Sequence, residues 1–221
     1  MKKKLLAGIL ISCLACLVYA GEITQDSVEI ISAESFIVLQ KDMQDGDVIF
    51  QSSMSGQSQA IQLATHSKYS HCGILFKEGD NFMVFEAVQP VKKTPLTQWI
   101  ARGDDKHYVV KRLKNREQVL TTEVVKKMKE TAKGFEGKNY DLYFEWTDAN
   151  IYCSELVWKI YKRAAGVEIG KLEKLKNFDL SNPIVKAKMK ERYGSKIPME
   201  EEVISPAAIY DSPLLETVKS E

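Results

Sequence analysis

Three residues of the chain could together carry out nucleophilic chemistry: Cys153, His71 and Glu86. A carboxylate bound to one nitrogen of an imidazole fixes the tautomer and leaves the other nitrogen free to take a proton. A cysteine becomes an effective nucleophile when such a base removes its thiol proton. These residue types therefore predict a Cys–His–Glu triad, provided that the fold brings the three side chains together.

His71 and Glu86 lie at the two ends of the segment KYSHCGILFKEGDNFMVFEA, which predicts a β-hairpin with its turn within residues 77–81. Because side chains alternate between the faces of a strand, we expect His71 to point away from Cys72. A turn centred between residues 78 and 79 pairs His71 directly with Glu86, at a Cβ separation of about 4.5–5.5 Å. A slip of one residue would separate the pair onto opposite faces.

Cys153 lies at the start of the clearest helical segment, NIYCSELVWKIYKRAAG, with Asn150 expected as the N-cap and Gly166 as the C-terminal stop. Apolar residues recur along this segment with helical spacing, namely Leu156, Val157, Ile160, Tyr161 and Ala164. Unpaired N–H groups and the dipole at a helix start favour a thiolate over a thiol. The backbone N–H of Cys153 could also donate into an oxyanion hole.

Each of these residues also has a purely structural interpretation. A histidine opposite a glutamate is commonly a satisfied polar pair, and a cysteine in an apolar stripe is commonly a core residue. We expect Cys72 to be core, and His66 and His107 to lie on the surface. The chain has three widely spaced histidines and no HExxH or CxxC pattern, so we expect no metal site and no cofactor.

The elements around these residues mix strands and helices. The patterns predict strands at 44–51 and 105–113, a short helix before the hairpin, and helices at 117–133 and 184–193.

Residues 1–20 have the pattern of a secretory signal: three lysines, an apolar run and a small residue, Ala20, at the cleavage point. The run is shorter than the roughly 20 residues that span a bilayer. Lipid anchoring at Cys13 is the alternative, but the sequence after Cys13 stays apolar, which favours cleavage near Ala20. Both routes predict a periplasmic or secreted protein.

Cleavage would remove three lysines, leaving 28 Lys+Arg against 30 Asp+Glu and a formal charge of −2. This balance gives no clustered basic surface for nucleic acid. The remaining chain fits one domain with its own core, and no later apolar run could span a membrane. Two of the four cysteines would remain, so at most one disulfide could form and the core must hold the fold.

The motifs DGDVIF, YSHCGILF, MVFEA and YCSELVWKIYKRAAG resemble those of the papain-like NlpC superfamily, whose bacterial members cleave cell-wall peptides. Ordinary members place the cysteine helix before the histidine strand, whereas no histidine follows Cys153 here. This order resembles the circularly permuted, YiiX-like branch, from about Asp45 to the ISPAAIY segment.

The resemblance implies an α+β fold of the circularly permuted papain-like (NlpC-type) kind, with an antiparallel sheet or barrel packed on a Cys-bearing helix. The expected domain is a single hydrolase domain over residues 21–221. Because the sequence from Val167 on is polar and broken by DLSNP and SKIP, residues 167–221 are expected to be a decorating C-terminal part of that domain. The resemblance also assigns the nucleophile to Cys153, the base to His71 and the acid to Glu86.

Two tyrosines enter through the same resemblance. Tyr140, in GKNYD, resembles an aromatic residue that assists the oxyanion or the substrate pocket in ordinary members. Tyr193, in KERYG, is a second pocket candidate.

The expected function is an exported cysteine hydrolase that cleaves an amide bond through an acyl-enzyme. Its substrate would be a small molecule, a peptide or a lipid amide of the cell envelope, either a cell-wall peptide or an N-acyl amine. The alternatives are a lipid acyltransferase or thioesterase of the same superfamily, a non-catalytic binding module, and a structural protein with a Cys72–Cys153 disulfide.

Overall fold

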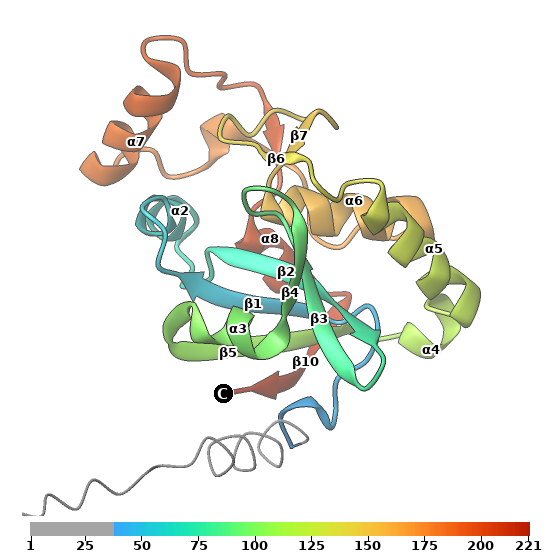
Figure 1. Cartoon of the computed structure of the whole chain (residues 1–221). Helices are drawn as coiled ribbons and strands as arrows, with labels where there is room; N and C mark the ends of the chain where they lie inside the picture. The colour runs from blue at the N-terminus through green and yellow to red at the C-terminus, as the bar shows by residue number, and fades with distance from the viewer. Residues whose placement is uncertain (1–37) are drawn as a thin grey trace, which may run out of the picture. The chain divides into compact units, whose positions relative to one another are not determined.

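A computed structural model describes residues 38–221, and the predicted signal sequence of residues 1–20 lies outside the described residues. Strands and helices are mixed along the described part, as expected for an α+β fold (Figure 1). Within residues 38–221, no helix combines the length and the apolar character needed to cross a bilayer. In chain order the elements are β1 (Val48–Ser53), α2 (Ser58–Thr65), β2 (His71–Glu78), β3 (Asn81–Glu86), β4 (Lys92–Pro95), α3 (Leu96–Ala101), β5 (Gly103–Leu113), α4 (Arg116–Val119), α5 (Thr122–Lys133), β6 (Asn139–Tyr140), β7 (Asn150–Ile151), α6 (Cys153–Ala165), β8 (Glu173–Lys174), the 3₁₀ turn η1 (Leu175–Asn177), α7 (Pro183–Tyr193), β9 (Glu202–Val203), α8 (Pro206–Tyr210) and β10 (Leu215–Ser220).

Six strands form one antiparallel sheet in the order β10-β5-β1-β2-β3-β4. Helices cover both of its faces (Figure 1). On one face Phe50 and Cys72 pack with residues of α5, α6 and α8, and on the other face Ile49 and Leu75 pack with Trp99 of α3. Because both faces are covered, the central strand β1 begins with a continuous buried apolar run.

The predicted β2–β3 hairpin is present, but its turn lies one residue further along the chain than expected. Glu78 pairs with Asn81, so Gly79 and Asp80 alone connect the strands. Gly79 has a φ of 60°, a conformation that glycine adopts without steric cost. Two-residue turns with glycine at the first position are favoured because their twist matches that of the flanking strands.

The predicted direct pairing of His71 with Glu86 is therefore wrong by two residues. A shift of two keeps both residues on one face, and a diagonal pair is still within reach of long side chains. In this register Gly73 lies opposite Glu86. A Cβ on Gly73 would lie 2.5 Å from Val84 Cγ1, 2.9 Å from the Phe85 carbonyl oxygen and 3.4 Å from Glu86 Cβ. The glycine therefore leaves the space that the Glu86 side chain needs.

The helix that carries the cysteine begins later than predicted. Its N-cap is Tyr152, and Cys153 is its first residue. Asn150, the predicted N-cap, lies instead in β7, where it pairs in parallel with Asn139 of β6. The predicted C-terminal stop is confirmed, since Gly166 follows the helix with a φ of 72°. The β6–β7 pairing therefore replaces the first turn that we expected and fixes the direction in which the chain enters α6.

Residues 167–221, predicted to decorate the domain, also contribute a strand to the main sheet and side chains to its core. Strand β10 pairs with β5 at the edge of the main sheet, and Ile209 and Leu215 are buried in the same core cluster as residues of α6. Helix α7 packs instead against α2, where Val185 and Met189 belong to a separate small cluster. The end of the chain thus completes the sheet, and α7 forms one wall of a peripheral layer.

We expect Gly73→Ala to destabilise the protein, because the new Cβ would approach the Val84 side chain and the Phe85 backbone within 3.0 Å. Overpacking of this kind typically costs about 1–3 kcal/mol. The free energy of unfolding, measured by chemical denaturation with tryptophan fluorescence, tests this. Gly56→Ala is the matched control, since a Cβ there meets nothing within 4 Å. Equal midpoints for the two variants would contradict the packing described.

Candidate active site

The two hairpin residues of the predicted triad are in contact. His71 Nε2 lies 2.6 Å from Glu86 Oε2, and both side chains are buried, with Glu86 fully so. The structure therefore brings together the pair that the strand alternation predicted. The two residues are diagonal neighbours in the sheet rather than directly paired.

Glu86 receives three further hydrogen bonds. Thr94 Oγ1 and Arg102 Nη2 each lie 2.5 Å from Oε1, and Trp99 Nε1 lies 2.9 Å from Oε2. Burial alone would raise the pKa of Glu86, but the bonds from His71 and Thr94 and the charge of Arg102 outweigh it and lower the pKa to about 2. Glu86 is therefore ionised at any physiological pH.

Sequence reasoning missed these three donors. They follow Glu86 by 8 to 16 residues, on β4, on α3 and just after α3, and no motif marks them. Trp99 also stacks on the His71 ring, with centroids 5.9 Å apart, so it fixes both partners of the pair.

Cys153 lies where the sequence places it, at the start of its helix, with 3% of its surface exposed. Burial alone would lower the pKa of His71, but hydrogen bonds with Cys153 and Glu86 raise the pKa to about 9. A hydrogen bond from the Cys72 thiol lowers the pKa of Cys153 well below its usual value against the effect of burial, and His71 lowers it further. The balance supports a thiolate beside an imidazolium.

Cys72 is buried in the core, as predicted, but it also contacts the nucleophile. It lies on the face of β2 that packs against α6, in the same cluster as Cys153. Burial, followed by the hydrogen bond with Cys153, raises the pKa of Cys72, so it stays a thiol and donates. Both cysteines are free, which differs from the disulfide-linked alternative.

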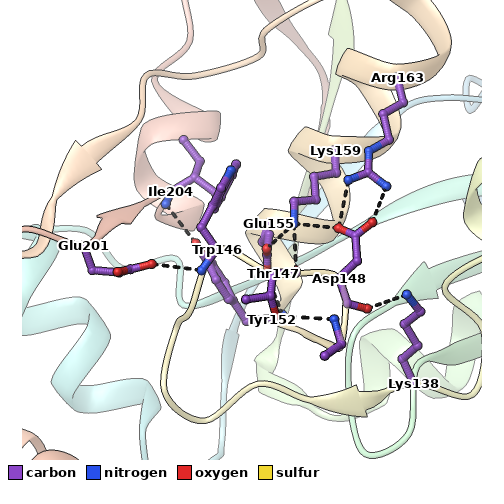
Figure 2. Close-up of polar contacts among 11 residues, drawn as sticks. Lys138, Trp146, Thr147, Asp148, Tyr152, Glu155, Lys159, Arg163, Glu201 and Ile204 are labelled. Atoms are coloured by element: carbon purple, nitrogen blue, oxygen red, sulfur yellow. Dashed lines mark hydrogen bonds and ion pairs between the residues drawn. The ribbon is translucent and has the colours of Figure 1, made fainter. Parts of the chain in front are cut away.

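A polar network that runs from buried Glu155 and Lys159 to exposed Asp148 and Arg163 holds the segment that enters α6 (Figure 2). Lys159 Nζ lies 2.6 Å from Glu155 Oε1 and 2.9 Å from Asp148 Oδ1. Arg163 donates two hydrogen bonds to the same Asp148 carboxylate, at 2.7 and 2.8 Å. The backbone N–H of Tyr152 donates to Glu155 Oε2 at 3.4 Å. The loop before the helix is thus tied to the helix itself.

The two carboxyl groups of this network, those of Glu155 and Asp148, differ in how readily they ionise. Burial raises the pKa of Glu155 to about 8, although Lys159 opposes the shift. Hydrogen bonds from Arg163 and then Lys159 lower the pKa of Asp148 despite partial burial. Asp148 therefore stays ionised and is the negative charge that pairs with the buried Lys159. If Asp148 moved away from the helix, the Lys159 ammonium would be left buried without a counter-charge.

A pocket adjoins Cys153, with about 720 Å³ of empty space when its open mouth is included. Most of its lining is apolar and comes from α2, η1, α7 and the segment before α8, including Ala60, Ile61, Leu175, Phe178, Met189 and Ile204. Among the described residues that line it, the only charged ones are Lys188 and Arg192. The pocket suits an apolar group next to the thiolate.

The two predicted pocket tyrosines differ in placement. Tyr140 lines the pocket together with Cys153, and its hydroxyl oxygen lies 2.7 Å from Gln57 Nε2. Tyr193 does not line it; its hydroxyl donates to the Tyr143 carbonyl at 2.6 Å. Its neighbour on α7, Arg192, does line the pocket, as do Lys188 and Met189 of the same helix. The sequence analysis missed Arg192.

Among residues 38–221, no three His, Cys, Asp or Glu side chains are grouped so that they could hold a metal ion.

Comparisons with known proteins match nearly the whole described part. The sequence model of the permuted papain-like amidase enzymes, YaeF/YiiX, C92 family, matches residues 42–219. The uncharacterized protein YiiX of Escherichia coli (strain K12) is 54% identical over 178 residues, covering 80% of this chain and 87% of the relative. The crystal structure described as metalloprotein yiiX from Escherichia coli O157:H7 is similar with a TM-score of 0.78 and 55% identity, covering 81% of this chain and 98% of that one.

We expect iodoacetamide to alkylate Cys153 at nearly the same rate from pH 6 to 8, because its thiolate is already formed. A free cysteine with a pKa of about 8.5 reacts roughly tenfold faster for each pH unit over that range. Peptide mass spectrometry identifies the labelled residue, and Cys72 should stay unlabelled. Glu86→Gln should restore a steep pH dependence, whereas Glu78→Gln on the same hairpin should not. A wild-type profile that follows free cysteine would contradict the thiolate assignment.

The His71–Glu86 pair also predicts a pH dependence of stability. The lowered pKa of Glu86 contributes stability above its unfolded value of about 4.3, which is lost as the pH falls to about 2. The raised pKa of His71 contributes below about 6.5 and is lost as the pH rises through about 9. The loss of stability in Glu86→Gln, measured by denaturation, should therefore be largest between about pH 4.5 and 6.5. A loss that stays constant from pH 3 to 9 would rule this out.

Proposed function

The chain belongs to the permuted papain-like amidase family of YaeF and YiiX, and on that premise we propose that it is a cysteine hydrolase that cleaves an amide bond through an acyl-enzyme on Cys153. The observation that carries the proposal is that His71, whose Nε2 lies 2.6 Å from Glu86 Oε2, also interacts with Cys153. That arrangement gives an ionised nucleophile and a proton donor in one buried site.

The proposed reaction begins with the proton already on His71. The Cys153 thiolate attacks the amide carbonyl carbon, and the carbonyl electrons move onto its oxygen. The tetrahedral intermediate collapses as His71 gives its proton to the leaving amine. Neutral His71 then takes a proton from water, the hydroxide attacks the thioester, and the departing Cys153 thiolate restores the ion pair.

Glu86 takes part without exchanging a proton in this scheme. Its carboxylate stays ionised and stabilises His71 as imidazolium. The oxyanion would be stabilised by the backbone N–H of Cys153 at the helix start, together with a side chain of the pocket.

The pocket supports an apolar acyl group, and hence an N-acyl amine rather than a cell-wall peptide. Its lining is largely apolar, and Lys188 and Arg192 are the only charged side chains of α7 that line it, whereas a stem peptide would bring charged groups into this apolar space. An acyltransferase or thioesterase that uses the same acyl-enzyme is the second candidate, because an apolar acyl pocket serves either reaction. An acyltransferase would pass the acyl group from Cys153 to an alcohol. A thioesterase would acylate Cys153 from a thioester, release the thiol, and then hydrolyse the acyl-enzyme with water.

We further propose that the protein is exported, with cleavage near Ala20, and acts on an amide substrate of the cell envelope. The secretory pattern of residues 1–20 supports this location. The solved relative from Escherichia coli O157:H7 is described as a metalloprotein. The described residues of this chain offer no cluster that fits a metal ion, so no step of the proposed reaction passes through one.

We expect the protein to hydrolyse N-dodecanoyl amides, and mass spectrometry to detect a dodecanoyl adduct on Cys153. Cys153→Ala should reduce the rate at least about 1,000-fold, because it removes the nucleophile. Cys72→Ser is the matched control, since a hydroxyl can still donate to the thiolate, and it should keep most of the activity. An adduct formed only with a cell-wall stem peptide would overturn the substrate preference. Alkylation without any acylation would favour the binding module.

A further inference from the structure

A chain of two hydrogen bonds runs across the pocket beside Cys153. The Arg192 guanidinium donates through Nη2 to Gln57 Oε1, and Gln57 Nε2 donates to the Tyr140 hydroxyl oxygen at 2.7 Å. The three residues lie on α7, at the N-cap of α2 and in β6, and all of them line the pocket together with Cys153. Segments that are far apart in the sequence therefore meet at one polar spot of an apolar pocket.

The direction of this chain is set by chemistry. Arginine carries only donors, so the group of Gln57 that faces Arg192 must be its carbonyl oxygen. The amide NH₂ of Gln57 then faces Tyr140, and the phenol oxygen must accept from it. The donor-only end of the chain therefore leaves one orientation for the Gln57 amide. The hydroxyl proton of Tyr140 must therefore point to a different partner.

The backbone around Tyr140 holds its ring near the nucleophile. Tyr140 pairs with Ile151, two residues before Cys153, and its N–H donates to Gln89 Oε1 at 2.7 Å. Burial and the charge of Cys153 raise the pKa of Tyr140, while the bond from Gln57 acts in the opposite direction. Tyr140 thus stays protonated, and its hydroxyl proton is not used by Gln57, in a pocket that Cys153 also lines.

We propose that Gln57 and Arg192 are positioning residues that orient the Tyr140 hydroxyl, so that it donates to the oxyanion formed when Cys153 attacks the substrate. The inference rests on the proposed acyl-enzyme reaction. A donor that is fixed before the reaction stabilises the developing charge without having to reorganise. Arg192 also lies over the Phe144 ring, 4.9 Å from its centroid, so a test must separate its effect on the hydroxyl from its packing.

Gln57→Glu makes that separation. A carboxylate has the shape of the amide and keeps Arg192 as its partner, but it only accepts hydrogen bonds. The Tyr140 hydroxyl must then donate to residue 57, which turns its proton away from the oxyanion. Pre-steady-state acylation of the full chain by p-nitrophenyl dodecanoate should fall about 100-fold, the loss typical for one oxyanion donor. Alkylation of Cys153 by iodoacetamide forms no oxyanion, so its rate and pH profile should not change.

Further variants locate the effect on the tyrosine. Tyr140→Phe should slow acylation as much as Gln57→Glu does, and adding Gln57→Glu to Tyr140→Phe should cause no further fall. Arg192→Lys, which also carries only donors, should keep more activity than Arg192→Gln, whose amide can face Gln57 in either orientation.

The outcomes distinguish this inference from the proposed function. If the wild type is acylated and Gln57→Glu is acylated just as fast, the positioning role is overturned but the proposed hydrolase function is not. The positioning role would also be overturned if Gln57→Glu slowed the Tyr140→Phe background as strongly as it slows the wild type. A wild-type protein that is alkylated but never acylated would overturn both.

Discussion

The structure of the site depends on one buried carboxylate, that of Glu86. It has no exposure to solvent and accepts from His71, Thr94, Trp99 and Arg102. A buried charge is tolerated only when it is paired and fully hydrogen-bonded, and these donors meet that condition from three separate elements. Because Glu86 stays ionised, His71 remains protonated at a pH well above its usual pKa. The imidazolium in turn stabilises a thiolate on the buried Cys153.

The nucleophile is placed by a second set of interactions on the opposite side of the sheet from α3. The β6–β7 pairing and the network around Lys159 determine where α6 begins, so they determine where Cys153 points. Lys159 is buried, and the cost of desolvating a buried charge offsets much of what its pairing contributes to stability. We therefore interpret the Glu155–Lys159–Asp148 network as a device that fixes geometry. The Cys72 thiol adds a hydrogen bond to Cys153 from β2, which links the position of the nucleophile to the sheet.

Prediction from the sequence succeeded where a local periodicity carried the information. Strand alternation placed His71 and Glu86 on one face, and this survived an error in register because a shift of two residues preserves the face. Helical spacing located the Cys153 helix and its stop at Gly166. The register itself was missed because it depends on a two-residue turn at Gly79, and a longer turn fits the same sequence equally well.

By itself, the sequence determined the β2–β3 hairpin, the Cys153 helix and the three residues capable of nucleophilic chemistry, since each follows from a local pattern. It did not predict β4, α3 or β10. Only the tertiary structure decided which polar groups surround those residues. Gln57 and Arg192 are separated by 135 positions, and no local rule connects them. The misplacement of Tyr193 has the same cause, because which face of α7 meets the pocket is set by its packing against α2. Such contacts arise from the packing of distant elements, which leaves no periodic trace in the chain.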